Sequence, residues 1–377
     1  MWAQATGSWL LSRYADVDAA ARNPLLVRGT DSFLSAAEQH ERRRAAGRDG
    51  MPNHERFVQF SLLEIDGERH RRLRLLLLGA LSRQNIAPLL PALEVQVQAL
   101  IGEALERGEL DFIEDLAARV PGHVIGELLG IPPADRPRLR RWSEDIVQFF
   151  DVQRTQEHKQ LAEETTTEFA AYLEELLAAR RRNPGADLLS HLNAAHAQGQ
   201  LDQTELISTA MLVLMAGHGS TIDVLGNSLN ALLQAPSEVQ RLRADPTLWT
   251  TAVDEFFRYD APLPYFHRYA SEAIEVGGRS FPAGTCFGLL YGSANRDEAA
   301  FPDADRLDLA RRPNRHLAFG RGAHLCLGNH LGRLSVGLVL RKLVNQCARI
   351  EPGADPVEYR PGLAARGPAH LPVRLSA

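Results

Sequence analysis

Residues 319–328 read Phe-Gly-Arg-Gly-Ala-His-Leu-Cys-Leu-Gly, a segment whose chemistry constrains the rest of the chain. The glycines at positions 320 and 322 allow the backbone to turn tightly and to approach a flat object closely. Cys326 follows at the expected start of a helix, where free backbone amides and the helix dipole favour a thiolate. Gly328 leaves space beside the sulfur. The segment is therefore suited to hold a sulfur anion against a large planar group.

Three interpretations of Cys326 are open. A lone cysteine at a helix start is often an inert buried residue. His324, Cys326 and His330 could contribute to a zinc site, although no fourth ligand has the usual spacing. The third interpretation is the axial ligand of a haem iron, because a thiolate under amide donors pushes electron density toward bound oxygen. Only this one accounts for the phenylalanine, glycines, histidine and cysteine together, so the segment predicts a haem-thiolate site.

The composition is that of a globular protein. The 377 residues are 45% hydrophobic and 24% charged, which is enough to enclose a large cofactor. A formal net charge of -5 argues against nucleic-acid and anionic-membrane partners. Three widely spaced cysteines form no disulfide framework, and the N-terminus lacks the basic and apolar regions of a signal peptide. We therefore expect a cytoplasmic protein.

Helical periodicity dominates the chain, and we expect one mainly α-helical domain over residues 1–377 with small β-sheets. Residues 26–64 are polar and are expected to form an irregular loop. The helix expected over 205–234 is apolar on all sides, which predicts that it runs buried through the middle of the protein. The other helices are expected at 16–22, within 69–130, and at 134–150, 157–182, 248–259 and 327–346, and the strands at 9–14, 273–276, 279–281 and 286–291.

The segment around Cys326 resembles the haem-binding signature of the cytochromes P450, at positions Phe319, Gly320, Gly322 and Gly328 as well as the cysteine. The resemblance extends over nearly the whole chain. It implies the family's mainly helical fold as a single domain, with a long central helix over the haem. The helix that precedes the first strand in the family has no counterpart here.

A second motif supports the resemblance. Glu255-Phe256-Phe257-Arg258 matches the family's Glu-x-x-Arg motif, on an expected helix upstream of the hairpin. Glu255 and Arg258 lie three residues apart and therefore share one helix face. Arg306 occupies the position whose arginine completes a buried triad with that pair in the family. An exposed helical ion pair is the alternative for Glu255 and Arg258 alone, but beside the cysteine loop the structural triad is favoured.

Four basic residues match contacts that the family makes to the two haem propionates: His70, Arg74, Arg268 and His324. His70 and Arg74 are spaced one helical turn apart, so both can reach the same carboxylate. Together the four supply cations for two buried carboxylates. The resemblance thus implies haem b as the cofactor, with Cys326 as the axial ligand of its iron.

The central helix carries the segment Ala216-Gly217-His218-Gly219-Ser220-Thr221, which resembles the family's Ala-Gly-x-Asp/Glu-Thr-Thr segment. In the family this segment is kinked and opens a groove for dioxygen and water. Gly219 stands where the family has an acid, and Ser220 stands where it has a threonine. The family uses that acid–alcohol pair to deliver protons. Because only hydroxyls remain here, a non-standard reaction is the alternative to ordinary monooxygenation.

The resemblance implies a haem-thiolate oxidoreductase that acts on a small organic molecule in secondary metabolism. Its alternatives are the same site catalysing coupling, rearrangement or nitrene-like transfer, and a non-catalytic relative, which the intact Cys326 disfavours. Electrons are expected from a separate ferredoxin or flavodoxin, since no nucleotide-binding glycine motif follows a strand. An acidic carrier would dock on a basic patch of Arg69, Arg71, Arg72, Arg311, Arg312, Arg315 and Arg321. The expected pocket is lined by residues 26–64 and 145–195 and by Met215, Leu263, Tyr265 and Phe266.

Overall fold

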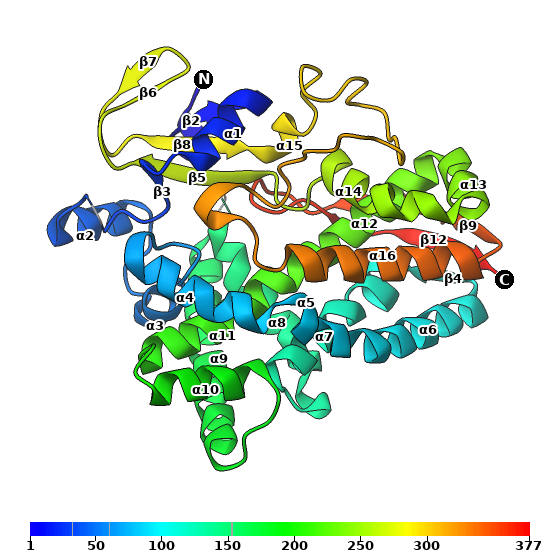
Figure 1. Cartoon of the computed structure of the whole chain (residues 1–377), viewed down its shortest axis with the longest axis horizontal. Coiled ribbons are helices and arrows are strands. Elements are labelled where there is room, and N and C mark those ends of the chain that lie inside the picture. Colours follow the sequence, from blue (N-terminus) through cyan, green and yellow to red (C-terminus); the bar gives the residue numbers. More distant parts are fainter. Residues whose placement is uncertain (32, 60, 152–153) are drawn as a thin grey trace.

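The structure is a computed structural model that describes residues 1–31, 33–59, 61–151 and 154–377. Helices form most of the molecule, and strands gather in one larger sheet beside the N-terminus and in smaller sheets elsewhere (Figure 1). The prediction of a mainly α-helical fold with small sheets is confirmed. Residues 32, 60, 152 and 153, which belong to the expected pocket segments, lie outside the described residues.

The helices are distributed along the whole chain. Those of the first half are α1 (Tyr14–Arg22), α2 (Ala36–Ala45), α3 (Pro52–His54), α4 (Gly67–Ala80), α5 (Arg83–Ile86), α6 (Leu90–Arg107), α7 (Arg119–Leu129) and α8 (Pro137–Val147). Those of the second half are α9 (Gln156–Arg182), α10 (Leu188–Ala197), α11 (Gln203–Gly217), α12 (Gly219–Gln234), α13 (Pro236–Ala244), α14 (Trp249–Tyr259), α15 (Tyr291–Ala294) and α16 (Asn329–Gln346). Short 3-10 or π turns are η1 (Gln4–Thr6), η2 (Glu55–Gln59), η3 (Ala87–Leu89), η4 (Ile113–Ala117), η5 (Pro133–Asp135), η6 (Gln148–Phe150), η7 (Pro246–Leu248) and η8 (Gly322–His324).

The strands form one five-stranded sheet and smaller units. The larger sheet has the order β1 (Trp2–Ala3), β2 (Ser8–Leu11), β8 (Cys286–Leu290), β5 (Tyr265–Ala270) and β3 (Leu26–Val27). A three-stranded sheet has the order β4 (Glu109–Asp111), β12 (Pro372–Ser376) and β9 (Arg349–Pro352). The two-stranded units are β6 (Ile274–Val276) with β7 (Arg279–Phe281), and β10 (Glu358–Tyr359) with β11 (Pro368–His370).

Strand β5 sorts its side chains between two environments. It pairs antiparallel with β8, so that Arg268 lies opposite Phe287, a fully buried residue of the sheet core. Because side chains alternate along a strand, Phe266 and Arg268 share one face of the sheet. Tyr265 and His267 share the other face. This alternation decides which β5 residues can reach the site described below.

Most of the expected elements are present, but the prediction of one long irregular loop over residues 26–64 was wrong. The hairpin forms around Gly277 and Gly278, both with a positive φ, and the strands and helices around it lie where expected. Residues 26–64, in contrast, contain β3, α2, α3 and η2 in addition to irregular segments. Helix α2 begins with a capping box, in which Ser35 accepts from the Glu38 amide while Glu38 accepts from the Ser35 amide. Helices α10 and α13 were also not predicted.

The central helix is two helices rather than one. Helix α11 begins with the expected cap at Asp202, paired with Glu205 in a capping box. The helix breaks at His218, whose φ of -86° and ψ of -72° separate α11 from α12. The stretch Gln203–Gln234 is long and apolar enough to cross a membrane by length and composition, and 67% of its most apolar window is buried inside the protein. That burial is typical of the core helix of a folded protein.

The break divides the two large hydrophobic cores. Side chains of α11 pack with α8, α9 and α10 in one core, and side chains of α12 pack with α6, α14 and α16 in the other. Between these cores, residues 216, 217 and 219–221 of the central helix are exposed or half-buried. Helix α16 crosses in front of this region, and the loop that leads into α16 lies between α4 and the larger sheet (Figure 1). The fold thus brings the cysteine loop to the region where the central helix is least covered.

Candidate functional site

The loop before α16 has the conformation that its glycines predict. Gly320 and Gly322 have φ of +67° and +68°, a region that other residues rarely adopt. A Cβ at Gly322 would lie 2.5 Å from the carbonyl oxygen of Ala21 on α1. The loop is closed by the Cys326 amide, which donates to the Phe319 carbonyl at 2.9 Å. Glycine is therefore required at position 322 by both conformation and space.

Cys326 lies three residues before α16 and keeps solvent-accessible surface. Desolvation by the surrounding protein raises the pKa of its thiol. The Gly328 amide, which bonds to the sulfur, and the guanidinium groups of Arg74 and Arg333 act in the opposite direction and favour the thiolate. A Cβ at position 328 would lie 3.9 Å from the Cys326 sulfur. Glycine at this position therefore leaves that side of the sulfur without a side chain.

The other two cysteines have no comparable setting. Cys286 is in strand β8 and Cys347 is buried after α16, as the sequence indicated. Burial raises the pKa of each thiol to about 11, so both remain protonated at neutral pH. In the part of the chain that the structure describes, no group of three His, Cys, Asp or Glu side chains could hold a metal ion. The zinc interpretation of His324, Cys326 and His330 is therefore wrong.

Phe319 anchors the start of the cysteine loop. Its ring lies 4.4 Å from that of Phe257 on α14, and the Arg333 guanidinium lies 4.3 Å from its centroid. Arg333 in turn donates to Asp254 at 2.6 Å. These contacts fix the loop against two helices, α14 and α16, and hold the sulfur in place.

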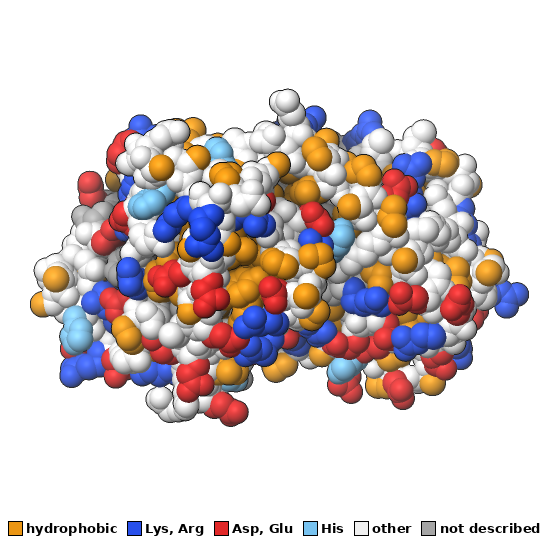
Figure 2. All heavy atoms as spheres, turned by 90° about the horizontal axis from the view of Figure 1, so that it is seen from below, with side chains coloured by type: hydrophobic (Ala, Val, Ile, Leu, Met, Phe, Trp, Pro, Cys, Tyr) orange, Lys and Arg blue, Asp and Glu red, His pale blue; other side chains and the backbone are white. Residues whose placement is uncertain are grey.

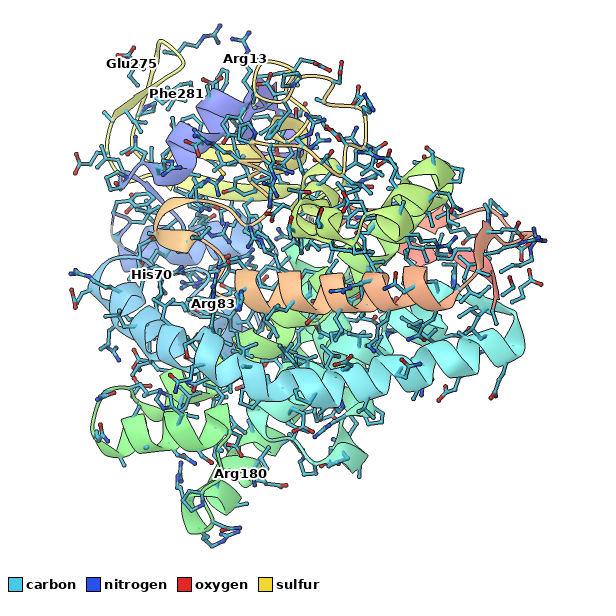
Figure 3. The ribbon with its side chains drawn as sticks, turned by 45° about the vertical axis from the view of Figure 1, so that its right-hand side comes forward. Arg13, His70, Arg83, Arg180, Glu275 and Phe281 are labelled. Atoms are coloured by element: carbon cyan, nitrogen blue, oxygen red, sulfur yellow. The ribbon has the colours of Figure 1, made fainter. Side chains whose placement is uncertain are left out.

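The four expected propionate contacts are brought together beside this loop. His70, on α4, stacks on His324 with ring centroids 4.3 Å apart, and Figure 3 shows His70 beside the loop that leads into α16. Arg74, one turn further, donates to the Leu325 carbonyl. Arg268 is buried, and its guanidinium lies near enough to His324 to lower the pKa of that imidazole further, in addition to the effect of burial. The four residues therefore lie close together, and their contact with haem propionates stays a prediction.

This basic cluster lacks the anions that would balance it. Burial lowers the pKa of Arg268 to about 10 and that of His70 to about 4. Asp66 accepts from His324 at 2.9 Å, but Arg74 and Arg268 form no ion pair with a described carboxylate. The buried Nε2 of His70 and the buried hydroxyl of Tyr291 have no hydrogen-bond partner among the described residues. Buried polar atoms are rarely left unpaired, so the cluster fits a group that brings its own carboxylates, as haem does.

The central-helix segment presents its hydroxyls toward the helix itself. Ser220 Oγ donates to the Ala216 carbonyl and Thr221 Oγ1 donates to the Gly217 carbonyl, each at 2.9 Å. Both oxygens keep lone pairs that can accept a further hydrogen bond. A Cβ at Gly219 would meet nothing within 4 Å, so open space lies where the family has its acid.

The residues that flank Gly219 do not replace the missing acid directly. The His218 side chain is buried away from solvent, and burial lowers its pKa to about 3, so the imidazole is neutral. Asp223, one helical turn after Gly219, is buried and forms an ion pair with Arg360. Asp223 is the carboxylate closest to Gly219 in sequence, and it is already bound by Arg360, which lies between β10 and β11.

The Glu-x-x-Arg pair is buried as predicted, but its third member was misassigned. Glu255 and Arg258 are fully buried and joined by two hydrogen bonds of 2.8 Å. The second arginine at Glu255 is Arg311, whose Nε lies 3.2 Å from Oε2. The side chain of Arg306 is exposed, and only its carbonyl takes part, accepting from Arg258 and Arg311. The prediction of Arg306 as the triad arginine is wrong.

The four residues expected to line the pocket do not gather in one place. Met215 is buried in the α11 core. Phe266 faces Tyr291, with ring centroids 6.0 Å apart, on the same sheet face as Arg268. Tyr265 points to the opposite face, where its ring covers Gly288. Leu263 is half-buried before β5. Strand alternation therefore prevents Tyr265 and Phe266 from lining one wall together.

The expected basic patch is smaller than the sequence indicated. Arg69 and Arg72 both bind Glu205, with distances of 2.9 and 2.6 Å. Arg311 is buried at Glu255 and cannot be part of a surface patch. Arg71 pairs with Glu68, and Arg321 lies near Asp18. Arg312 and Arg315 form no ion pair with a described carboxylate.

Comparisons with known proteins agree with this geometry. The sequence profile of the family described as Cytochrome P450 matches residues 136–360. Nocardicin C N-oxygenase of Nocardia uniformis subsp. tsuyamanensis is 36% identical over 373 residues, which cover 97% of this chain and 89% of that protein. P450BioI, solved in complex with hexadec-9Z-enoic acid ligated acyl carrier protein, has a TM-score of 0.90 at 29% identity and covers 98% and 92% of the two chains. Myxobacterial CYP267B1, solved with myristic acid, has a TM-score of 0.89 at 34% identity and covers 98% and 90%.

Proposed function

The chain belongs to the cytochrome P450 family. We propose that it is a haem b monooxygenase that acts in secondary metabolism in the cytoplasm. The observation that carries the proposal is the setting of Cys326. Its sulfur accepts a backbone amide, keeps solvent-accessible surface and lies near two arginines. A thiolate held in this way would bind a haem iron and supply the electron density that favours cleavage of the O–O bond.

The residues that would hold the haem are already assembled. Cys326 would bind the iron, while Arg74, Arg268, His70 and His324 would bind the two propionates. The unpartnered Nε2 of His70 would gain an acceptor there. When bound, the group supplies two-electron oxidation of an organic substrate by dioxygen, with insertion of one oxygen atom.

The chain's own part in that chemistry is to position protons. Ser220 Oγ and Thr221 Oγ1 are held by the carbonyls one turn before them, so each hydroxyl has a fixed orientation and a free lone pair. Water in the open space at Gly219 can donate to those oxygens, because no side chain occupies it. The alternative, a reaction other than oxygen insertion at the same site, is favoured only by the absence of an acid at position 219.

The relatives define the expected substrates only broadly. One is named an N-oxygenase, and two solved structures hold a fatty acid or a fatty acyl group on a carrier protein. We infer a small organic substrate for this chain as well. Electrons would come from a ferredoxin or flavodoxin, the kind of donor that the family resemblance implies.

The assignment of Cys326 is tested by its spectrum. The reduced, carbon-monoxide-bound protein should show the strongly red-shifted Soret band of thiolate ligation, and Cys326→Ser should abolish it. Cys286→Ser and Cys347→Ser are matched controls that should keep the band, since burial holds both thiols protonated. A normal band in Cys326→Ser would show that another residue binds the iron.

A further inference from the structure

The segment 48–61 contains a concentration of buried polar atoms without a partner. They lie in one stretch of the chain, whereas buried polar atoms in folded proteins are almost always hydrogen-bonded. Those without a partner among the described residues are Arg48 Nε, His54 Nδ1, His54 Nε2, Gln59 Nε2 and Ser61 Oγ. Such a concentration indicates a place where a bound molecule supplies the missing partners.

Three arginines around this segment lack a carboxylate. Arg42, Arg48 and Arg154 form no ion pair within 4 Å of a described carboxylate, and the side chain of Arg48 donates no hydrogen bond to a described residue. Among the described residues, the Arg154 side chain donates to two backbone carbonyls, those of Ala46 at 3.2 Å and Asp151 at 2.8 Å. Arg42 lies over the Tyr269 ring at 4.0 Å. The local positive charge is therefore only partly balanced.

Three nearby acids are engaged by other groups, and one of them, Glu163, accepts the amides of Asn53 and His54. Glu64 is bound by Arg28 and by His267. The Asp151 carboxylate lies near Arg154, and it accepts the amides of Leu363 and Ala364 at 3.0 and 3.2 Å. None of the three carboxylates contacts Arg48 within ion-pair distance.

Apolar rings adjoin the two arginines. The Arg154 guanidinium lies 5.4 Å from the Phe149 centroid. His54 is 1% exposed, and its ring lies 5.4 Å from Phe149 and 6.0 Å from Phe150. Burial lowers the pKa of His54 to about 3, and the charges of Arg48 and Arg154 lower it further, so the imidazole is neutral. The setting combines two cations, a neutral hydrogen-bonding ring and two phenylalanines.

This cluster lies beside β5 and α11, two elements that also carry residues of the proposed haem site. Arg48 lies near enough to His267 to affect its pKa, and His267 is on the face of β5 opposite to the propionate contact Arg268. The turn after His54, η2, packs on α11, where Ser208 donates to the Phe57 carbonyl at 2.7 Å. Arg48 is half-buried and Arg154 is exposed, so an anion from solvent can reach both.

We propose that the substrate of this enzyme carries a carboxylate on an apolar body, and that Arg48 and Arg154 bind that carboxylate while Phe150, the half-buried ring beside His54, contacts the body. The inference rests on the proposed function, whose substrate class it narrows. Two guanidinium groups near each other repel, and a carboxylate between them replaces repulsion by charge-assisted hydrogen bonds. A singly charged, otherwise apolar molecule suits the rings better than a phosphate ester, which carries more charge.

The test compares acids with their neutral analogues by equilibrium binding. The holoenzyme is titrated with 4-phenylbutanoate, 4-phenylbutanamide, decanoate and methyl decanoate, and the dissociation constants are read from the Soret shift and, independently, from calorimetry. Each acid should bind at least about tenfold more tightly than its neutral analogue. Arg48→Gln and Arg154→Gln should each reduce that ratio to about threefold or less.

Arg44→Gln is the matched control, because Arg44 lies in the same region but pairs with Glu41 on the surface. It should keep the wild-type ratio, and phenyl phosphate should bind more weakly than the carboxylates. Without ligand, Arg48→Gln should melt at or above the wild-type temperature, since it removes one of two like charges. A large fall in melting temperature would show a structural role instead.

Several outcomes would overturn the inference. These are equal binding of acids and neutral analogues, an unchanged ratio in both variants, an equal loss in Arg44→Gln, or preference for phenyl phosphate. The carbon-monoxide spectrum separates this failure from that of the proposed function. If wild type and variants all show the thiolate band but do not discriminate acids, only the substrate inference fails. If the wild type lacks the band, the proposed function itself fails.

Discussion

At the residue scale, the buried Glu255 binds two arginines, Arg258 and Arg311. Their different surroundings give a prediction. Arg311→Ala would leave the Pro302 carbonyl without its donor, remove one of two donors from the carbonyls of Asp303 and Arg306, and weaken the balance at Glu255. The free energy of unfolding should fall by about 3 kcal/mol or more. Arg306→Ala removes only an exposed side chain and should change it by less than about 0.5 kcal/mol.

Denaturant unfolding of the two variants, followed by fluorescence and by the Soret band, measures the difference. A destabilised Arg306→Ala beside a stable Arg311→Ala would restore the assignment that the sequence suggested. The error has a physical reason: Arg306 contributes through its carbonyl, and a sequence motif does not distinguish a side-chain contact from a backbone contact. Cys326 and its glycines were predictable because their roles depend on a contiguous segment. Arg311 depends on a chain reversal between residues 303 and 311, which no local pattern specifies.

The break at His218 determines what the central helix can do. Because a Cβ at Gly219 meets nothing within 4 Å, a longer side chain can enter that space. Gly219→Glu with Ser220→Thr should therefore fold and restore an acid beside the hydroxyl. If proton delivery limits turnover, product formed per electron consumed should rise at least about twofold with the true substrate.

Gly219→Ala with Ser220→Thr is the matched control, since it fills part of the same space without an acid. An equal gain in both double variants would attribute the effect to packing or to the threonine rather than to a proton. Unchanged coupling in both, with ordinary hydroxylated product, would show that glycine at this position has no mechanistic role.

At the scale of elements, prediction succeeded where one side of an element is apolar. Helices α9, α14 and α16 and the β6–β7 hairpin lie close to their expected bounds. The hydrophobic pattern did not show the break between α11 and α12 because apolar residues lie on both sides of it, although the family resemblance implied a kink in that segment. Helix α2 was missed because none of its residues is buried, so its sequence shows no hydrophobic periodicity. Its capping box, Ser35 with Glu38, was the one available signal.

Over the whole molecule, charge is arranged in small clusters of both signs. On the face seen in Figure 2, acidic and basic side chains are interspersed around apolar ones, which does not suit a polyanionic partner. The sequence shows how many arginines a segment has, but it does not show which carboxylates lie beside them in the folded protein. Glu205 on α11, for example, binds Arg69 and Arg72 of α4 across more than 130 residues of chain. The basic surface near the cysteine loop is therefore built from fewer residues than expected.

The unpaired cations on that side still favour an acidic electron donor. Arg312 and Arg315 precede His316, which shares Asp254 with Arg333 at the start of α16, and Arg83 lies beside the same helix end (Figure 3). None of these three, Arg83, Arg312 or Arg315, forms an ion pair with a carboxylate in the described ranges. A negatively charged ferredoxin should be steered toward them, and salt should screen that attraction.

The rate of reduction by an acidic ferredoxin, measured by stopped flow, should accordingly fall about tenfold between low salt and 0.5 M salt. Arg312→Glu should slow reduction about threefold or more at low salt and flatten the salt dependence. Arg279→Glu changes the net charge equally, but Arg279 is exposed on β7, in the hairpin at the far corner from α16 (Figure 1), so its rate should match the wild type. Equal slowing by both variants would mean that net charge alone governs association. A rate indifferent to salt in the wild type would show that the donor docks through apolar contacts, which the exposed Leu75 and Leu78 of α4 could provide.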